Sequence, residues 1–412
     1  MDVPELRPPP LVRRVAQACA DAGGRCLLVG GSVRDHLMGA PVKDWDLEVY
    51  GLQPEALERT LGTIARVDTV GRAFSVFKLH AHGLELDVSL PRRDSKVGPG
   101  HTGIEATGDP DMDPKEAARR RDLTINAIMV DLADGSVLDP WGGRQDLADG
   151  LLRAVDPTTF LEDPLRTLRV VQFTARFGFR AVPELAPLCR EAALGELPEE
   201  RVLGEWAKLL LRGRQPSAGL AFAREADLLR RVFPEHPHAP EVDAALDRAV
   251  ALRDTLEPEG RQLALMTAVW LAGLTPQAAE ATLDRLKLHR WFGFPARERG
   301  LAAAAHAGDP HATDAELRWL STRAEVDLAL RAHEALHATS TAAARRRAEI
   351  LGVLTEAPPR LVEGRDVLAA GLRPGPRVGQ VVAAAYAAQL DGTVDDRATA
   401  LALVDQLVAS PT

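Results

Sequence analysis

The stretch LLVGGSVRDHLMGAPVKDWDLEVYG, residues 27–51, decides the fold of this chain. Its apolar start predicts a short strand, which a glycine-rich turn ends before a helix begins near residue 33. Glycines let backbone N–H groups approach a phosphate closely, and the N-terminus of a helix favours anions. The candidate phosphate contacts are Gly30, Gly31, Ser32 and Arg34. The alternative is an ordinary strand-to-helix turn in which Ser32 caps the helix.

Acidic side chains recur at every second position after this helix. The pattern predicts a strand over 45–50, and Asp44 comes directly before it. Because alternate side chains of a strand point to one face, Asp44, Asp46 and Glu48 should point the same way. Like charges on one face of a sheet are unfavourable unless a cation lies between them. Mg²⁺ prefers oxygen ligands, so the pattern predicts a two-Mg²⁺ site, whereas the plainer alternative is a solvated edge strand. A phosphate cradle shortly before the acids favours the metal site.

The chain changes character near residue 150. Before that point we expect helices over 11–22 and 54–62, strands over 26–29, 75–80 and 84–90, and a mobile loop over 91–113. After it, Ala-, Leu- and Arg-rich segments with helical apolar spacing predict helices alone. The expected fold class is therefore α+β, with a mixed β-sheet head followed by an all-α remainder.

Composition sets broad limits on function. A chain of 412 residues suggests roughly two to four domains. The net charge of −9 counts mildly against a nucleic-acid partner, but local arginine clusters such as 119–121 can bind one. Three widely spaced cysteines argue against a disulfide framework and a zinc ribbon. Because there is no signal-peptide-like start and no long apolar run, we expect a cytoplasmic protein without a membrane partner.

Residues 27–51 resemble the first signature of the class II tRNA nucleotidyltransferase/poly(A) polymerase family, part of the polymerase-β-like superfamily. The resemblance implies that Asp44 and Asp46 are catalytic and bind Mg²⁺, and that Gly31 and Arg34 contact a triphosphate. Some members place a third metal-binding acid where this chain has Asp87. Many members have Ala-Thr two places after the second aspartate, where this chain has Glu-Val, so no family role carries over to Glu48.

A second block, RRRDLTINA at 119–127, resembles the family string R-R-D-x-T-x-N-A. The resemblance implies that Arg121 binds nucleotide, and that an Asp–Asn pair distinguishes ribose from deoxyribose. Asp122 and Asn126 are four residues apart and would share one face of a helix. The alternative is that Asp122 only caps a helix.

The segment EDPLR, residues 162–166, resembles the family motif E-D-x-x-R. Asp163 accepts hydrogen bonds, Arg166 donates them, and residues three apart are neighbours on a helix surface. Cytosine and adenine each present a donor beside an acceptor that match such a pair, whereas guanine and uracil present the reverse order. The pair is thus a candidate amino-acid template for C and A, and the alternative is a pair that only supports the helix. The further candidate nucleotide contacts of this segment are Glu162, Arg169 and Gln172, the last standing where many members have Arg.

Taken together, the resemblance implies a four-part chain that acts on tRNA. The expected parts are a polymerase-β-like nucleotidyltransferase head over 1–150, a templating neck over 151–215, a helical body over 216–330 and a tRNA-binding tail over 331–412. The implied activity is template-independent addition of C and A nucleotides to the tRNA 3′ end from CTP and ATP, with Mg²⁺ as cofactor. Within the family, restricted CC addition, A addition and poly(A) synthesis remain alternatives.

Two alternatives come from other classes of protein. The segment HEALH, residues 333–337, matches the zinc-peptidase helix motif H-E-x-x-H, although Ala343 occupies the position of the third histidine in one such class. A non-catalytic RNA-binding module would keep RNA affinity without turning over nucleotides. Metal analysis and a nucleotide incorporation assay separate these alternatives from a nucleotidyltransferase.

Overall fold

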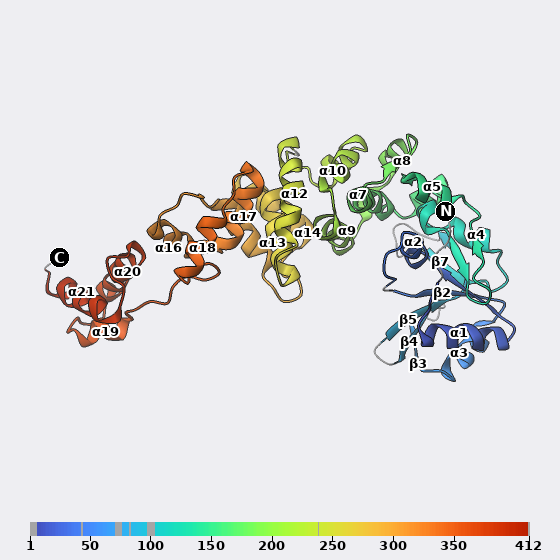
Figure 1. The fold of residues 1–412 in the computed structure, drawn as a ribbon, viewed down its shortest axis with the longest axis horizontal. Helices are drawn as coiled ribbons and strands as arrows, with labels where there is room; N and C mark the ends of the chain where they lie inside the picture. Colours follow the sequence, from blue (N-terminus) through green and yellow to red (C-terminus); the bar gives the residue numbers. More distant parts are fainter. Residues whose placement is uncertain are drawn as a thin grey trace. The chain divides into compact units, whose positions relative to one another are not determined.

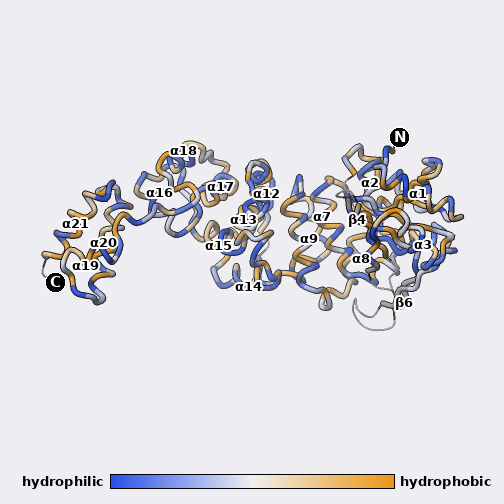
Figure 2. Tube along the Cα trace, turned by 90° about the horizontal axis from the view of Figure 1, so that it is seen from below, coloured by the Kyte–Doolittle hydropathy of each residue, from blue (hydrophilic) through white to orange (hydrophobic). Residues whose placement is uncertain are grey.

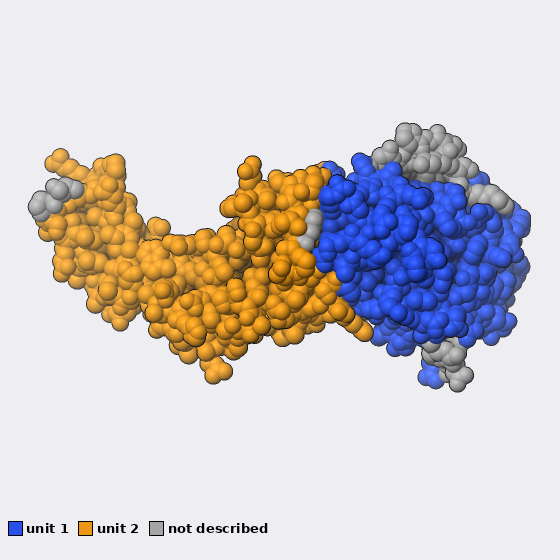
Figure 3. Space-filling view, turned by 90° about the horizontal axis from the view of Figure 1, so that it is seen from above, with its two compact units in different colours: residues 1–205, 218–232 blue, residues 206–217, 233–412 orange. Residues whose placement is uncertain are grey.

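A computed structural model of the chain describes residues 6–42, 44–70, 76–81, 84–96, 104–237 and 239–410. The chain divides into two compact units (Figure 3). The first comprises residues 1–205 and 218–232, and the second comprises 206–217 and 233–412. This division into two does not test the four-part organisation, which stays a prediction.

A seven-stranded mixed sheet forms the head, in the strand order β3-β4-β5-β2-β1-β8-β9. Its strands are β1 (Arg25–Val29), β2 (Asp46–Tyr50), β3 (Arg66–Val70), β4 (Val76–Ala81), β5 (Leu84–Ser89), β8 (Met129–Asp131) and β9 (Val137–Leu138). Strands β2 and β5 pair in parallel, and the other neighbours in the sheet pair antiparallel. The parallel register places Asp46 opposite Asp87, so two acids far apart in the sequence meet on adjacent strands.

Helices with apolar faces cover this sheet. Helix α1 (Pro10–Asp21) lies beside α3 (Pro54–Gly62), as Figure 1 shows, and it also packs against β1, while α3 packs against β3. Leu11, Val12, Val15 and Cys19 of α1 are buried at the spacing of one helix face. Helix α2 (Gly31–Leu37) follows β1 directly. The helices and strands predicted before residue 90 are confirmed in their described parts, with boundaries shifted by one or two residues.

The mobile loop expected over 91–113 is wrong for its described parts. Strand β6 (Arg92–Lys96) pairs antiparallel with β7 (Ile104–Gly108), while residues 97–103 lie outside the described residues. The next helix, α4 (Pro114–Arg119), begins just beyond the expected loop with Asp113 as its N-cap. RRDSK contains no apolar residue, and IEATG alternates apolar and polar residues over only five positions within a segment rich in Gly, Asp and Arg, so neither segment gave a clear strand signal.

The neck sequence is helical apart from one small ladder. Its helices, within the expected range 151–215, are α6 (Pro157–Glu162), α7 (Leu165–Phe177), α8 (Leu185–Glu191) and α9 (Glu199–Arg212). Helix α5 (Gly143–Asp149) precedes this range, and α10 (Pro216–Glu225) and α11 (Leu228–Val232) follow it. The two-residue strands β10 (Leu151–Leu152) and β11 (Arg180–Ala181) pair in parallel. The expectation of helices alone after residue 150 is therefore wrong at this point, because pairs this short leave no periodic signal.

The second unit continues as helices. They are α12 (Pro240–Arg253), α13 (Glu259–Trp270), α14 (Pro276–Leu286), α15 (Ala296–Ala305), α16 (Asp314–Ser321), α17 (Val326–His337), α18 (Ala342–Ile350), α19 (Gly364–Ala369), α20 (Pro376–Asp391) and α21 (Arg397–Ala409). Trp206, Phe233 and Trp270 form a buried aromatic cluster with ring centroids 4.6–5.0 Å apart. Figure 2 shows hydrophobic and hydrophilic residues mixed along these helices, as expected of amphipathic segments. No helix among the described residues is long and apolar enough to cross a membrane.

Candidate active site

The predicted metal-binding acids gather at one end of β2. Asp46 is the first residue of β2, and Asp87 of β5 is its partner in the parallel register. Asp44 is exposed and precedes the strand, so the expectation that Asp44 and Asp46 share one face stays a prediction. Burial raises the pKa of Asp46; the Arg121 guanidinium opposes this shift, and the charges of Asp87 and Asp44 add to it. Asp44 and Asp87 therefore each lie close enough to Asp46 to influence its charge.

The donor chemistry of this site suits a hard divalent cation. Asp87 Oδ1 is buried and accepts no hydrogen bond from any described residue, although Lys78 Nζ lies 3.3 Å away. Among the described residues, no three His, Cys, Asp or Glu side chains converge on a single metal position, so the acids form no closed three-ligand site. Carboxylate oxygens are the ligands that Mg²⁺ prefers, and Mg²⁺ takes its remaining ligands from water and substrate phosphates. The residues therefore fit such an ion in an open site.

The glycine turn lies beside these acids. Gly30 has a φ of 74°, and a Cβ there would lie 3.1 Å from Arg121 Nη1 and 3.8 Å from Asp46 Oδ2. Ser32 Oγ donates a hydrogen bond to the Asp44 carbonyl oxygen at 2.7 Å, and the Asp46 amide lies 3.5 Å from the same hydroxyl. Because Gly30 is the N-cap of α2, the alternative in which Ser32 caps that helix is wrong. Ser32 instead fastens the acidic segment to the turn.

Arg34 is buried between the head and α7. Its guanidinium lies 5.1 Å from the ring centroid of Phe173 and 5.0 Å from that of Phe177. Arg34 Nη1 donates to Asn126 Oδ1 at 2.6 Å, and Nη2 donates to Asp35 Oδ1 at 2.6 Å. The side chain thus links α2 to the neck, and its contact with a triphosphate stays a prediction.

Asp122 and Asn126 are hydrogen-bonded, but not across a helix face. Helix α4 ends at Arg119, and Thr124–Asn126 forms a single 3₁₀ turn, so the expected shared α-helical face is wrong. Asn126 Nδ2 donates to Asp122 Oδ1 at 2.9 Å. Arg169 Nε donates to Asp122 Oδ2 at 2.6 Å. Burial alone would raise the pKa of Asp122, but Arg169, Asn126 and the Leu123 amide together hold it below its usual value.

The strand pattern grouped Glu48 with the acids of the predicted metal site, and the family resemblance gave it no role, whereas the structure places it next to the predicted nucleotide-binding arginine. Its side chain is fully buried, and Glu48 Oε1 lies 2.9 Å from Arg120 Nη2 and 3.8 Å from Arg121 Nη2. Tyr50 Oη donates to Glu48 Oε2 at 2.7 Å. Burial would raise the pKa of Glu48, but the two arginines and the tyrosine outweigh it and lower the pKa. The only available signal was the alternation with Asp46.

The candidate template residues do not share a helix. Asp163 lies between α6 and α7 in an extended conformation, because the residue before a proline is disfavoured in a helix. The Asp163 carboxylate accepts two hydrogen bonds from Arg201, at 3.2 and 2.9 Å. The Arg166 guanidinium donates to the carbonyl oxygens of Thr159 and Arg120. The expectation of one common helix surface is therefore wrong, and Arg201 is a residue that the sequence did not single out.

The remaining neck candidates differ in exposure. Glu162, the last residue of α6, is exposed. Arg169 is half-buried through its ion pair with Asp122. Gln172 is buried, and its Oε1 has no hydrogen-bond partner among the described residues. A nucleotide contact by Gln172 would therefore require it to change position.

The HEALH segment lies on α17, where the ring centroids of His333 and His337 are 4.4 Å apart. Glu334 Oε2 accepts hydrogen bonds from the Thr341 amide at 3.0 Å and the Thr341 hydroxyl at 2.8 Å. The glutamate thus joins α17 to the start of α18, and the described residues offer no third metal ligand here. This arrangement does not support the zinc-peptidase alternative.

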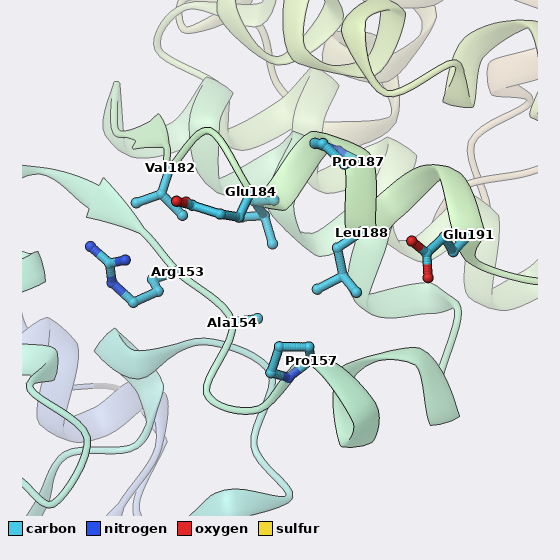
Figure 4. Close-up of a pocket in the computed structure, with 9 residues that line it drawn as sticks. Arg153, Ala154, Pro157, Val182, Glu184, Pro187, Leu188 and Glu191 are labelled. Carbon is cyan, nitrogen blue, oxygen red and sulfur yellow. The ribbon is translucent and has the colours of Figure 1, made fainter.

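A separate cavity of about 540 Å³ lies between the segment after β10 and α8. Its floor is apolar, with Ala154, Pro157 and Leu188, and Figure 4 shows Leu188 directed toward Pro157. Glu184 and Glu191 lie among its lining residues. None of the predicted site residues lines this cavity, so it is not the candidate active site.

Comparison with known proteins links this geometry to a family. Residues 26–153 match the family described as the poly A polymerase head domain. The Multifunctional CCA protein of Methylococcus capsulatus is 41% identical over 263 residues, which cover 58% of this chain and 59% of that protein. The Multifunctional CCA protein of Leptothrix cholodnii is 38% identical over 298 residues, covering 69% of this chain and 68% of that protein. This chain thus spans only about three fifths of the length of the first of these relatives.

The fold is shared with a solved structure. The crystal structure of the Bacillus stearothermophilus CCA-adding enzyme in complex with CTP aligns with a TM-score of 0.72 at 23% identity. The alignment covers 97% of this chain and 98% of that one. The expected fold class, a polymerase-β-like head with a mixed sheet followed by a mostly helical remainder, is therefore confirmed.

Proposed function

The chain belongs to the family of the multifunctional CCA proteins, and from this membership we propose that it adds C and A nucleotides to the 3′ end of tRNA. CTP and ATP supply the nucleotides, and diphosphate is released. The observation that carries the proposal is the meeting of Asp46 and Asp87 on adjacent strands beside the Gly30 turn and Arg121. This combination supports nucleotidyl transfer because it brings candidate metal ligands to a turn that can accept phosphates.

Nucleotidyltransferases of this kind generally use divalent metal ions, and Mg²⁺ is our specific proposal. Asp44, Asp46 and Asp87 would hold it. When bound, such an ion lowers the pKa of the attacking 3′-hydroxyl and neutralises charge on the leaving diphosphate. The amides of Gly30 and Gly31, together with Arg121, bind the triphosphate by the same logic.

The chain's own residues also supply sugar and base recognition in this proposal. Asp122, oriented by Asn126 and Arg169, accepts a hydrogen bond from the ribose 2′-hydroxyl. Asp163 and Arg166 offer an acceptor and a donor to the edges of C and A, and Arg201 holds the Asp163 carboxylate in one orientation. Because all these donors and acceptors have partners in the structure, an incoming base must replace some of their present hydrogen bonds.

An incorporation assay tests the proposal. Full-length protein is incubated with Mg²⁺ and tRNA transcripts that end at the discriminator base, with CTP, ATP or both, and the products are sized. CCA addition predicts three added nucleotides with both substrates. Two nucleotides would indicate CC addition, and long products would indicate poly(A) synthesis. No addition to these transcripts, together with one adenosine added to a second transcript that already ends in CC, would indicate A addition. Binding of tRNA without any incorporation would leave a non-catalytic RNA-binding module.

A matched pair of variants ties the activity to the site. Asp46→Asn removes one charge from the candidate metal ligands and should reduce incorporation to background while the protein stays folded. Asp68→Asn removes one charge from β3 of the same sheet, where the Asp68 side chain is about half exposed and pairs with Arg66 and His80. Because neither partner belongs to the candidate site, this variant should keep its activity. The tRNA-binding role of the tail and the cytoplasmic location remain predictions.

A further inference from the structure

A tight turn in the second unit exposes an aromatic ring. Between α14 and α15, Trp291 and Phe294 form a two-residue bridge, with N···O distances of 2.8 and 3.0 Å in the two directions. The residues between them, Phe292 and Gly293, have φ values of 45° and 84°. Phe292 is 88% exposed, more than any other large hydrophobic residue that the structure describes.

Neither backbone preference nor core packing explains a phenylalanine at this position. A two-residue turn with positive φ at both central positions favours Asn-Gly, and a bulky side chain at positive φ is strained. An exposed ring also gains little from removal of apolar surface from water. A strained residue without a structural reason is a ground for seeking a function, since such strain persists at binding sites.

The turn is fixed firmly to α13. A Cβ on Gly260 of α13 would lie 2.4 Å from Phe294 Cβ, so only glycine admits Phe294 at this distance. Trp291 Nε1 donates to Glu259 Oε1 at 2.8 Å, and Arg290 Nη1 donates to the Gly293 carbonyl at 2.7 Å. These contacts therefore hold the backbone that carries Phe292 in place. The centroids of the Phe292 and Trp291 rings are 5.4 Å apart.

The charge around the turn suits an anionic partner. Residues 284–299 contain five Lys and Arg residues and two acids, in a chain whose net charge is −9. Two of the five are already paired with acids, Arg285 with Glu235 and Arg297 with Asp284. Lys287, His289 and Arg290 have exposed side chains close to the ring in the sequence. A rigid exposed aromatic ring among basic side chains is the arrangement by which proteins stack on unpaired bases and contact adjacent phosphates.

We propose that Phe292 stacks on an unpaired base of the RNA substrate, while Lys287 and Arg290 face its phosphates. This inference rests on the proposed function for the identity of the RNA as tRNA. It assigns to the second unit a contact through a base, in addition to any contact that it makes through phosphates.

Three substitutions at position 292 test the stacking. The probe is a tRNA transcript lacking its 3′ CCA, and the measurement is the Kd of the full-length protein without nucleoside triphosphates. Phe292→Asn should weaken binding about 5-fold or more, as expected for the loss of one stacked base. Phe292→Leu keeps an apolar side chain but no ring and should weaken binding similarly, whereas Phe292→Tyr should bind as the parent protein does.

Folding does not confound this comparison. Asparagine tolerates a positive φ better than phenylalanine, so Phe292→Asn should unfold at a temperature no lower than the parent protein. Unchanged RNA affinity in this variant would overturn the proposal. A protein partner that contacts the exposed ring would then be the alternative. Full affinity in Phe292→Leu would also overturn it, because a general apolar contact would then suffice.

Incorporation kinetics separate this inference from the proposed function. If both hold, Phe292→Asn raises the KM for tRNA and leaves kcat unchanged, because Phe292 lies outside the candidate active site. If the parent protein adds CCA and the variant has the same KM, the stacking inference alone fails. If the parent adds no nucleotides but the variant still binds RNA more weakly, the RNA contact stands and the proposed activity fails.

Discussion

Glu48 Oε1 accepts a hydrogen bond from Arg120 Nη2 at 2.9 Å, across 72 positions of the sequence. The carboxylate is fully buried, and the Arg120 side chain is 23% exposed. Arg121, the candidate triphosphate contact, is the next residue along the chain, and its Nη2 lies 3.8 Å from the same oxygen. A buried charge on β2 therefore holds the arginine segment beside the acids and the glycine turn.

Glu48→Gln should weaken both folding and nucleotide binding. The amide preserves the shape of the side chain but leaves two arginines without their buried counter-charge, which costs about 1–3 kcal/mol of the free energy of unfolding. Because Arg121 loses a partner that orients it, the KM for CTP and ATP should rise more than kcat falls. Urea unfolding and steady-state incorporation measure the two effects.

Tyr50→Phe is the matched control for this prediction. It removes the hydrogen bond from Tyr50 Oη to Glu48 Oε2, which measures 2.7 Å, but it leaves the ion pair intact. We expect a loss of about 1 kcal/mol of stability and little change in KM. Equal changes in KM for the two variants would contradict a role for the Glu48 charge in orienting Arg121.

Arg201→Lys should relax the choice of nucleotide. Arg201 donates two hydrogen bonds to Asp163, and lysine keeps the charge but cannot form this two-pronged contact. If Asp163 reads the base, its looser orientation should lower the preference for CTP over UTP by about 5-fold or more, a share of the roughly 1–3 kcal/mol of one bidentate contact. Single-nucleotide incorporation with each triphosphate gives this ratio.

Arg190→Lys provides a comparison at a distance from the template. Arg190 belongs to α8 and donates to the Glu225 carbonyl oxygen rather than to Asp163. Its substitution should leave the CTP preference unchanged. An unchanged preference in Arg201→Lys as well would argue that Asp163 does not depend on Arg201 for its orientation.

Local patterns predicted the helices and most of the strands before residue 90, but not β3, β6, β7, β8 or β9, and not the contacts between elements. The helix over 54–62 was predictable because its apolar residues recur on one face, and the structure has it at Pro54–Gly62. The pairing of Asp46 with Asp87 and of Glu48 with Arg120 depends on strand order, which no local pattern contains. These long-range contacts are the ones that assemble the candidate site.

The errors at Asp163 and Asn126 have a common physical origin. In each case two residues at helical spacing suggested a shared helix face. Pro164 interrupts the helix after Glu162, and the turn at Thr124–Asn126 is only three residues long. The spacing in the sequence therefore identified the residues of each pair. It did not identify their backbone conformation, which depends on the proline and on packing against other elements.

Stability should depend on pH through Asp122. The folded state holds the pKa of Asp122 below its unfolded value of about 3.9, chiefly because Arg169 and Asn126 outweigh the effect of burial. Its stabilising contribution is therefore complete above the unfolded pKa and is lost as the pH falls through the lower, folded pKa. At pH 7, Asp122→Asn should be less stable by about 1–3 kcal/mol.

Urea unfolding of Asp122→Asn and the parent protein at a series of pH values checks this sign. The difference between the free energies of unfolding of the two proteins should remain constant from pH 7 to about pH 5 and should become smaller below about pH 4. A difference that widens on acidification would mean that the folded state favours the protonated carboxyl. The hydrogen bonds from Arg169 and Asn126 would then have been overestimated.

Gly143→Ala should disturb ribose recognition from outside the site. Gly143 begins α5, and a Cβ there would lie 2.1 Å from the Thr124 carbonyl oxygen, in the 3₁₀ turn that carries Asn126. The backbone must shift to relieve this overlap, so we expect a loss of about 1–3 kcal/mol of stability. The same shift should reduce the preference for ATP over dATP, because Asn126 orients Asp122.

Gly204→Ala is the control for this prediction. It adds the same methyl group within α9, at a position where the new Cβ would have no neighbouring atom within 4 Å, and it should stabilise the protein slightly. Full ribose selectivity in a destabilised Gly143→Ala protein would separate the turn from sugar recognition.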